Sequence, residues 1–398
     1  MAAQVFAYNR SVRRVYFDNN ATTPVLPEVL EAMQPYFSEH FGNASSIHHH
    51  GQETRAAVER ARESVATLLG CKASELVFTS GGTEADNLAI FGLVREGDHV
   101  ISSTIEHHAV LKSCKHLQSA GFEVTYVPVD RCGLVDPGDV RRALRPNTKL
   151  ITIMMANNET GVLQPVEEIG DIAADADVYF HTDAVQAAGK VAVDVKRIAC
   201  DLLSISGHKM HASQGVGALY LRKGTALHPI FYGGSHERSR RAGTENVPGI
   251  VGLGKAAELA KAALDRRELS QMSELRDRIE QQILAKIEST GVNGQGAPRV
   301  PNTTNIYFDG IEGEALVIAL DLKGLAVSTG AACSSGAIEP SHVLIAMGLT
   351  ADRARASVRL SLVKQNTREE VDFALSLLSP TVARLRELSP VYNTRASK

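Results

Sequence analysis

The stretch "DLLSISGHKM" (Asp201–Met210) predicts a buried strand that ends in a cluster of polar side chains. Its first half is apolar, and Ser206, His208 and Lys209 follow directly. Similar runs, "ELVFTS", "HVISS", "KLITIMM" and "VYFHTD", alternate along the chain with helical segments such as "TRAAVERARESVATLLG" and "TEADNLAIFGLV". This alternation predicts an α/β fold with a wound, mostly parallel sheet. In such sheets ligands bind at the carboxyl ends of the strands.

The sequence changes character after Pro248. The long, charged helical region "KAAELAKAALDRRELSQMSELRDRIEQQILAKIES" indicates a connector, and "TNIYF", "GEALVIAL", "ASVRLSL" and "EEVDFALSLL" continue with strand and helix patterns. We therefore expect an N-terminal segment over residues 1–18, a large α/β domain over 19–262 and a smaller C-terminal α+β domain over 263–398.

Composition limits the class of protein. The chain has 398 residues, 44% hydrophobic and 22% charged, with a formal net charge of -3, so no nucleic-acid or membrane partner is expected. An odd number of cysteines without C-x-x-C spacing argues against a disulfide framework or a thiol zinc site. These cysteines are Cys71, Cys114, Cys132, Cys200 and Cys333. We expect a cytoplasmic protein, and the leader "MAAQVFAYNRSVRR" leaves a short organellar presequence as the alternative.

A lysine at the end of a buried strand is unusual, because lysines are normally solvated. Burial lowers the pKa of such an amine, here Lys209, and makes it nucleophilic. Asp183 in "YFHTDAVQ" could hold a ring nitrogen protonated, and the turn of Gly81, Gly82 and Thr83 opens a helix where a phosphate can bind. Amine, acid and phosphate site together predict pyridoxal phosphate as the cofactor.

Weaker candidates follow other strands. His107 or His108 in "STIEHHAV" could stack on a planar ring or move a proton, and Asn157 or Asn158 in "MANNETG" could bond a ring substituent or a substrate carboxylate. Each alone is more often a satisfied histidine or a turn residue. The histidine triplet at residues 48–50 lacks carboxylates or cysteines at ligand spacing, so no resident metal is expected.

A set of motifs, taken together and in one order, resembles the cysteine desulfurases of the NifS and IscS type, class V members of the aminotransferase fold. The motifs are "FTSGGTEADNLAI", "EHHAV", "NNETG", "HTDAVQ", "SISGHK", "GGSHERSRRAGTENVP", "STGAACSSG", "EPSHVL" and "SVRLSL". The resemblance spans nearly the whole chain. It implies a PLP-dependent enzyme of fold type I that converts L-cysteine to L-alanine.

The resemblance also implies roles for single residues. Lys209 would form a Schiff base with the cofactor, Asp183 would bind the pyridine nitrogen and His107 would stack on the ring. Positions that match phosphate contacts are Gly82, Thr83, Ser206 and His208. Positions that match contacts to the phenolic oxygen are Asn158 and Gln186. Thr244 in "RAGTEN" matches a residue that reaches the phosphate of the neighbouring subunit, which implies a homodimer with shared sites.

The same resemblance assigns the substrate side of the site. Arg359 in "SVRLSL" matches the arginine that binds the substrate carboxylate, with Asn158 as a further contact. Lys209 would remove the α-proton, and His107 is our candidate for moving the proton of the thiol. Cys333 in "STGAACSSG" would attack the substrate sulfur and carry it as a persulfide, on a loop that we expect to be mobile without substrate. Cys333 is also the candidate for transient iron–sulfur ligation.

Two alternatives stay open at this point. A selenocysteine lyase or another class V enzyme would share most of these residues. A non-enzymatic alternative is a platform on which sulfur, iron and a scaffold protein meet. A sulfur-acceptor or iron–sulfur scaffold protein is the expected partner, with iron–sulfur assembly, tRNA thiolation and nitrogenase maturation as the candidate destinations of the sulfur.

Overall fold

A seven-stranded sheet lies at the centre of the computed structural model, which describes residues 13–330 and 339–389. The strand order is β2-β8-β7-β6-β5-β3-β4. The strands are β2 (Leu76–Thr79), β3 (His99–Ser103), β4 (Glu123–Val127), β5 (Thr148–Thr152), β6 (Tyr179–Asp183), β7 (Leu202–Ser206) and β8 (Gly217–Leu221). Neighbours are parallel except that β8 is antiparallel to β2 and β7. The wound, mostly parallel sheet predicted from the sequence is confirmed.

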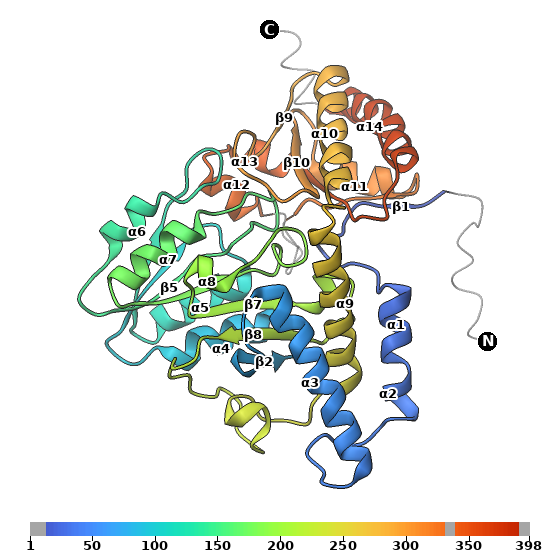
Figure 1. The fold of residues 1–398 in the computed structure, drawn as a ribbon. Coiled ribbons are helices and arrows are strands. Elements are labelled where there is room, and N and C mark those ends of the chain that lie inside the picture. Colours follow the sequence, from blue (N-terminus) through green and yellow to red (C-terminus); the bar gives the residue numbers. More distant parts are fainter. Residues whose placement is uncertain (1–12, 331–338, 390–398) are drawn as a thin grey trace, which may run out of the picture.

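Helices cover both faces of this sheet, as Figure 1 shows. They are α3 (His49–Leu69), α4 (Gly82–Leu93), α5 (His108–Ser119), α6 (Pro137–Ala143), α7 (Val166–Asp175), α8 (Val195–Ile198) and α9 (Val247–Asp265). Two further helices, α1 (Pro27–Met33) and α2 (Pro35–Ser38), pack against α9. In β2, Leu76 and Phe78 join the core beneath α3 and α9, whereas Val77 joins the core beneath α4 and α5. Burial on both faces explains why the strands are apolar runs.

A smaller antiparallel sheet of order β12-β10-β9 organises the C-terminal part. Its elements are α10 (Ser270–Lys286), β9 (Thr290–Val292), β10 (Thr303–Phe308), α11 (Gly313–Asp321), β11 (Leu325–Ala326), α12 (His342–Ala346), α13 (Ala351–Arg355), β12 (Ser357–Ser361) and α14 (Arg368–Leu388). The first strand, β1 (Val15–Tyr16), pairs in parallel with β11, and Val15 and Phe17 are buried in the core of this part. The segment around β1 is thus packed into the small sheet's core.

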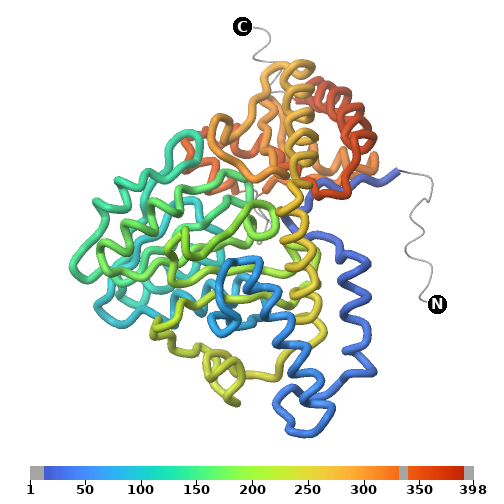
Figure 2. The backbone as a smooth tube through the Cα atoms, viewed as in Figure 1, coloured from blue at the N-terminus to red at the C-terminus, as the bar shows by residue number. Residues whose placement is uncertain are grey.

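Helix boundaries follow local chemistry. Helix α3 ends where the sequence predicts, because Gly70 takes the left-handed conformation with φ of 72°. The long helical region predicted after Pro248 is instead two helices, α9 and α10, separated at residues 266–269, where Arg267 has φ of 55°. Helix α9 runs beside α3 in the tube view of Figure 2 and contacts it along its length. No helix within residues 13–330 and 339–389 is long and apolar enough to cross a membrane.

Candidate active site

The site centres on Lys209, the last residue of a 3-10 turn, η2 (Gly207–Lys209), that follows β7. The amine Nζ donates hydrogen bonds to the carbonyl oxygens of Asn20, at 2.5 Å, and Ala21, at 2.7 Å. Burial, and after it the nearby Arg359 guanidinium, lowers the pKa of Lys209 to about 8. A substantial fraction of this amine is therefore neutral, and nucleophilic, near physiological pH.

Asp183 ends the neighbouring strand β6 and is buried. One carboxylate oxygen, Oδ1, accepts a hydrogen bond from the backbone N–H of Val185 at 2.9 Å. Burial raises the pKa of Asp183 to about 6. A cationic group placed beside this carboxylate would therefore be strongly favoured.

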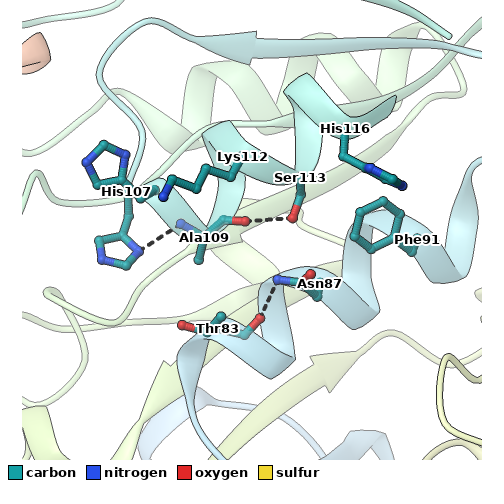
Figure 3. Close-up of a pocket in the computed structure, with 9 residues that line it drawn as sticks. Thr83, Asn87, Phe91, His107, Ala109, Lys112, Ser113 and His116 are labelled. Carbon is teal, nitrogen blue, oxygen red and sulfur yellow. Dashed lines mark hydrogen bonds between the residues drawn. The ribbon is translucent and has the colours of Figure 1, made fainter. Parts of the chain in front are cut away.

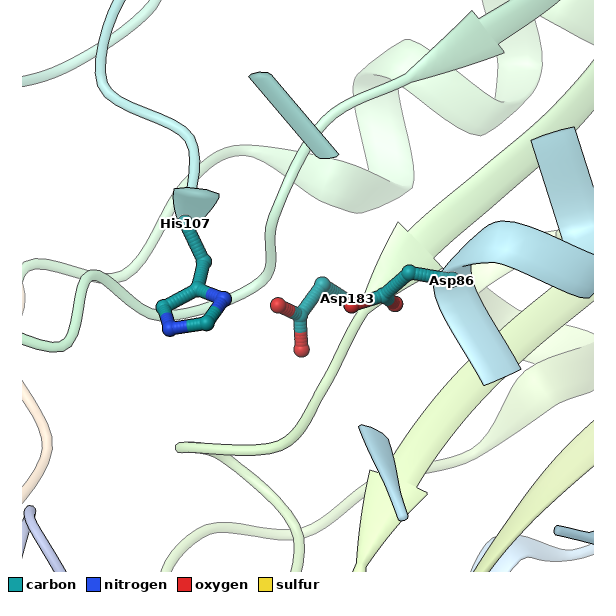
Figure 4. Close-up of side chains that lie close together, drawn as sticks. All are labelled: Asp86, His107 and Asp183. Atoms are coloured by element: carbon teal, nitrogen blue, oxygen red, sulfur yellow. The ribbon is translucent and has the colours of Figure 1, made fainter. Parts of the chain in front are cut away.

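A second buried acid, Asp86 on α4, lies next to Asp183 (Figure 4). Polar atoms of Asp86, Asp183 and His107 all lie within 4.8 Å of one another. The Oδ1 atom of Asp86 is buried and has no hydrogen-bond partner. Burial and the charge of Asp183 raise the pKa of Asp86. Two acids and a histidine form the one group in the described part of the chain that could hold a metal ion. The two buried carboxylates could equally accept a positively charged organic group.

His107 caps helix α5, because its Nδ1 accepts a hydrogen bond from the backbone N–H of Ala109 at 3.2 Å. The ring is solvent-accessible at the mouth of the site, and desolvation together with the positive charge of Lys209 lowers its pKa to about 4. The neutral ring with Nδ1 as acceptor carries its hydrogen on Nε2. Accepting a proton at Nδ1 would require His107 to give up the cap.

The N-terminus of α4 provides the expected anion site. Gly82 opens the helix, and a Cβ atom there would lie 2.7 Å from Cγ2 of Val185, so a side chain would not fit without displacing Val185. The side chain of Ser206 is next to it, with Cβ 3.5 Å from the same position. Glu84 braces the turn, accepting from the backbone N–H of Ser80 at 2.8 Å. Unpaired N–H groups at this end favour a phosphate.

A pocket of about 650 Å³ opens between α4 and α5 (Figure 3). Thr83 and His107 lie at one end of it, and Phe91 and His116 lie at the other. Lys112 also lines the pocket and contributes a positive charge. Two residues with expected cofactor contacts, Thr83 and His107, therefore line this pocket, whereas Lys209 and Asp183 do not.

The structure separates the two asparagines of the "NNETG" motif. Asn157 is buried, and its Oδ1 accepts from the backbone N–H groups of Glu159 and Thr160 at 2.9 and 3.0 Å, so it holds the turn. Asn158 is half-buried and uses its carbonyl oxygen to accept from Arg359 Nη1 at 2.9 Å. Of the two asparagines, Asn158 is therefore the one whose backbone contacts Arg359, the expected substrate-binding residue.

Two further predicted cofactor contacts lie beside Lys209. Gln186 is buried, donates to the Asn20 carbonyl at 3.0 Å, and accepts from Lys190 Nζ at 2.6 Å. His208 is half-buried and its Nδ1 lies 3.2 Å from Thr22 Oγ1. Burial and the charges of Lys209 and Lys190 lower the pKa of His208 to about 4.

Arg359 extends from β12 of the small sheet toward this group. Its Nη2 binds Asp18 Oδ1 at 2.6 Å, and its Nε is buried without a hydrogen-bond partner. Arg359 is only 4% exposed, so the unused donor lies in a site that is largely closed to solvent. An incoming carboxylate could take that donor.

Cys333 lies outside the described residues, and the expectation of a mobile loop falls there too. The residues that precede and follow the segment 331–338 both lie near one buried acid, Glu159. Ser341 Oγ donates to Glu159 Oε2 at 2.5 Å, and a Cβ atom on Gly330 would lie 3.1 Å from the same oxygen. Both described flanks of the cysteine segment are therefore held beside the "NNETG" turn.

Thr244 is exposed on the segment between β8 and α9. This segment packs against the edge of the large domain, where Arg241 binds Glu84 at 2.8 Å (Nε to Oε1). The segment contains the 3-10 turn η3 (His236–Ser239), which Figure 1 shows far from the small domain. The structure thus places Thr244 on the surface, and none of the interactions that it describes connects Thr244 with Lys209.

Residues that the sequence predictions missed include Asn20, Lys190, Asp18 and Asp86. The sequence could have indicated Asp86 as a functional residue, because an acid in the apolar face of "TEADNLAI" has no structural reason to be buried. The "YFDNNATTP" motif contains Asp18 and Asn20, but nothing in their spacing relates them to Lys209. Lys190 gives no signal of its own.

Comparison with known proteins agrees with this geometry. The family model "Aminotransferase class-V" matches residues 15–373. The chain is similar to "Cysteine desulfurase IscS" of Dictyoglomus turgidum, with 50% identity over 95% of this chain and 97% of that protein. It is also similar to "Cysteine desulfurase IscS" of Methanosarcina thermophila, with 51% identity over 95% of this chain and 94% of that protein.

A solved structure of a "NifS-like protein" superimposes with a TM-score of 0.87 at 38% identity, covering 94% of this chain and 100% of that one. The fold, the order of the motifs and the sequence identity all point to one group. The chain belongs to the class-V aminotransferase family and, within it, to the cysteine desulfurases of the IscS and NifS type.

Proposed function

We propose that this chain binds pyridoxal phosphate between Lys209, Asp183 and the N-terminus of α4, and uses it to move sulfur from L-cysteine to Cys333. The observation that carries the proposal is the buried Asp183 carboxylate, which keeps one oxygen free beside an amine whose pKa is lowered to about 8. Relatives named cysteine desulfurases, about half identical over nearly the full length, support the choice of substrate.

The residues present fit the cofactor. A protonated pyridine nitrogen would supply the cationic partner that the buried Asp183 lacks. The glycine turn at Gly82 supplies backbone N–H groups for a phosphate, with Ser206 beside it, and Thr83 and His208 are further candidates for phosphate contacts. Asn158 and Gln186 are candidates for the phenolic oxygen, and His107 for stacking on the ring. When bound, pyridoxal phosphate supplies an aldehyde that bonds amines and a ring that withdraws electrons from the substrate α-carbon.

The chain's own groups then perform three tasks. Arg359 binds the substrate carboxylate with its unused Nε donor, and so orients the α-carbon. Lys209, neutral above a pH of about 8, accepts the α-proton at Nζ. His107 presents a hydrogen-bond donor at Nε2 while Nδ1 caps α5, so it orients the reacting groups in this geometry and takes a proton only when the cap opens.

The sulfur step balances without an external oxidant. The Cys333 thiolate attacks the sulfur of bound L-cysteine, a sulfur–sulfur bond forms and the bond from that sulfur to the substrate β-carbon breaks. The electron pair of the broken bond stays with the β-carbon, which takes a proton to become the methyl group of alanine. Overall, a thiol and L-cysteine give a persulfide on Cys333 and L-alanine, and an acceptor protein would then receive the outer sulfur.

We also propose a homodimer in which Thr244 of one protomer reaches the phosphate site of the other. Thr244 is exposed and so is available to a second chain, and the pocket beside Thr83 is a candidate for the shared phosphate site. Sedimentation of the purified protein should give the mass of two chains. A monomer that binds cofactor as tightly as the family enzymes would count against shared sites.

The test of function combines trapping with product analysis. Borohydride reduction of the purified yellow protein, followed by peptide mass analysis, should place the cofactor on Lys209. Addition of L-cysteine should produce alanine and a persulfide on Cys333. Cofactor on another lysine, or alanine formed without any persulfide, would overturn the assignment.

A further inference from the structure

Asn20 lies at the junction of the two parts of the molecule and is 2% exposed. Its backbone N–H donates to Ser361 Oγ at 2.9 Å, and its Nδ2 donates to Thr303 Oγ1 at 2.9 Å, both in the small domain's sheet. The second Nδ2 hydrogen goes to the carbonyl of Asn158 in the large domain, at 3.1 Å. A single side chain thus connects both domains at the site.

The acceptors of Asn20 are equally occupied. Its Oδ1 accepts hydrogen bonds from Asn302 Nδ2 at 3.1 Å and from Lys190 Nζ at 3.3 Å. Its backbone carbonyl oxygen accepts hydrogen bonds from Gln186 Nε2 at 3.0 Å and from Lys209 Nζ at 2.5 Å. Every donor hydrogen and every acceptor lone pair of the residue is therefore used. A network satisfied in this way fixes atomic positions, because any displacement leaves a buried polar group unpaired.

The carbonyl of Asn20 is directed at the reactive amine, and that of Ala21 joins it at 2.7 Å from Nζ. Two carbonyl oxygens that accept from one amine stabilise its ammonium form and oppose the desolvation of Lys209. A lysine bonded to a cofactor cannot keep these contacts unchanged. The contacts therefore belong to states in which the amine is free.

We propose that Asn20 is the positioning residue of Lys209: its carbonyl, with that of Ala21, receives the amine whenever the amine is released from the cofactor, and its side chain holds that carbonyl between the two domains. This inference rests on the proposed function, since it assumes that Lys209 is the cofactor lysine. It assigns the "NNAT" segment a task in each catalytic cycle, namely to hold the released base near the substrate.

The charged and titratable groups that face Lys209 come from several elements, and they are Asp18, His107, Asp183, Lys190, His208 and Arg359. Their effects are common to all variants that leave them in place. Lys190 is bonded to the Asn20 side chain, so its effect belongs to the Asn20 network, and a change at Asn20 that moves the titration of the amine is assigned to that network.

The experiment measures how fast cofactor-stripped, full-length protein regains its visible absorbance with added pyridoxal phosphate, as a function of pH. Only the neutral amine bonds the aldehyde, so the wild-type rate should be half-maximal near pH 8, the pKa of Lys209 being about 8. In Asn20→Ala the carbonyl is no longer held in place, so the ammonium form of Lys209 loses stabilisation and the midpoint should fall by about half a pH unit. In Asn20→Asp the added negative charge stabilises the ammonium form, so the midpoint should rise by about one pH unit.

Asn19→Ala is the matched control. Asn19 is 1% exposed and its Nδ2 donates to the Ser361 carbonyl at 2.8 Å, but it does not contact Lys209. This variant should lose thermal stability while keeping the wild-type midpoint. If the Asn20 variants fold poorly, Thr303→Val removes one bond to Asn20 at nearly constant volume and should shift the midpoint slightly downward.

The outcomes separate two failures. Equal midpoints in wild type, both Asn20 variants and Thr303→Val, with the cofactor trapped on Lys209 in each, would overturn the inference alone. Wild-type protein that does not bond the cofactor at Lys209 would overturn the proposed function and this inference with it. Opposite shifts for alanine and aspartate at position 20 would establish the role, since a merely structural loss shifts neither.

Discussion

Arg62 and Glu237 form a buried ion pair that joins α3 to the segment bearing Thr244. The distance from Arg62 Nη2 to Glu237 Oε1 is 2.7 Å, and both side chains are 4% exposed. Glu237 Oε2 also accepts from the backbone N–H of Phe78 in β2, at 2.9 Å. Glu237, Arg238 and Ser239 all have positive φ, an unfavourable conformation for such residues that this anchor holds in place.

We predict that Glu237→Gln destabilises the protein by about 3 kcal/mol, because Arg62 would keep a buried charge without its partner. The loss should be concentrated in residues 224–246, which hydrogen exchange would show, and cofactor affinity should fall with it. Glu387→Gln breaks the exposed pair with Arg384 and should change stability by less than about 1 kcal/mol. Equal effects of the two substitutions would contradict the buried-anchor interpretation.

Asp183→Asn should separate function from stability. Asparagine keeps an oxygen for the Val185 N–H but removes a buried charge, so cofactor-free protein should gain stability, on the order of 2 kcal/mol at pH 7, while desulfuration is lost. The pKa of Asp183 in the folded state is raised to about 6. Above that pH the carboxylate is charged, so its burial destabilises the folded wild type to the full extent. This destabilisation disappears as the pH falls toward the unfolded value of about 4.

Thermal unfolding of cofactor-free wild type and Asp183→Asn across this pH range checks the sign. The two melting temperatures should converge as the pH falls below about 6. A gap that widens toward acid pH would show that the buried carboxylate is stabilised as an anion, contrary to its raised pKa.

Arg359→Lys should raise the KM for L-cysteine about 10- to 100-fold, because a single ammonium group cannot bond Asn158 and Asp18 and also offer the separate donor that Nε presents to the carboxylate, so one charged hydrogen bond is lost. The value of kcat should change less, since the reacting atoms are untouched. Arg353→Lys, at the half-exposed pair with Asp309, is the control and should leave KM unchanged. Steady-state kinetics with alanine as the measured product would decide between the two outcomes.

Cys333→Ser should retain the cofactor absorbance and substrate binding but reduce alanine formation by at least about 1,000-fold, because a hydroxyl at neutral pH is a poor nucleophile toward sulfur. Cys132→Ser is the control, since Cys132 is a half-exposed free cysteine in the large domain. Persulfide labelling of the wild type should mark Cys333 alone. Normal alanine production by Cys333→Ser would remove Cys333 from the mechanism.

Much of the large domain could be predicted because its signals are local. Apolar strands, the polar residues that follow them and the helix end at Gly70 each lie within one short stretch of sequence. Lys209 and Asp183 were found in this way, since β6 and β7 are neighbours in the sheet and their ends must meet. The family resemblance supplied Arg359, which lies in a separate part of the chain.

The features that escaped prediction depend on distant contacts. The polar groups of Asn20 are satisfied by Asn302, Ser361 and Lys190, and no spacing rule relates residues so far apart. The break between α9 and α10 contains neither glycine nor proline, so it gave no local signal. The sequence pattern of α4 could have predicted that Asp86 is buried, but not that it lies beside Asp183 and His107.

The pairing of β1 with β11 has a consequence for how this chain is made. Val15 is synthesised long before its partner Leu325, because the whole large domain lies between them in the sequence. The large domain can form its sheet while synthesis continues, since all of its strands precede the small domain in the sequence. The Asp18 and Asn20 contacts with the small domain must wait. A competent site is therefore among the last parts of the molecule to form during biosynthesis.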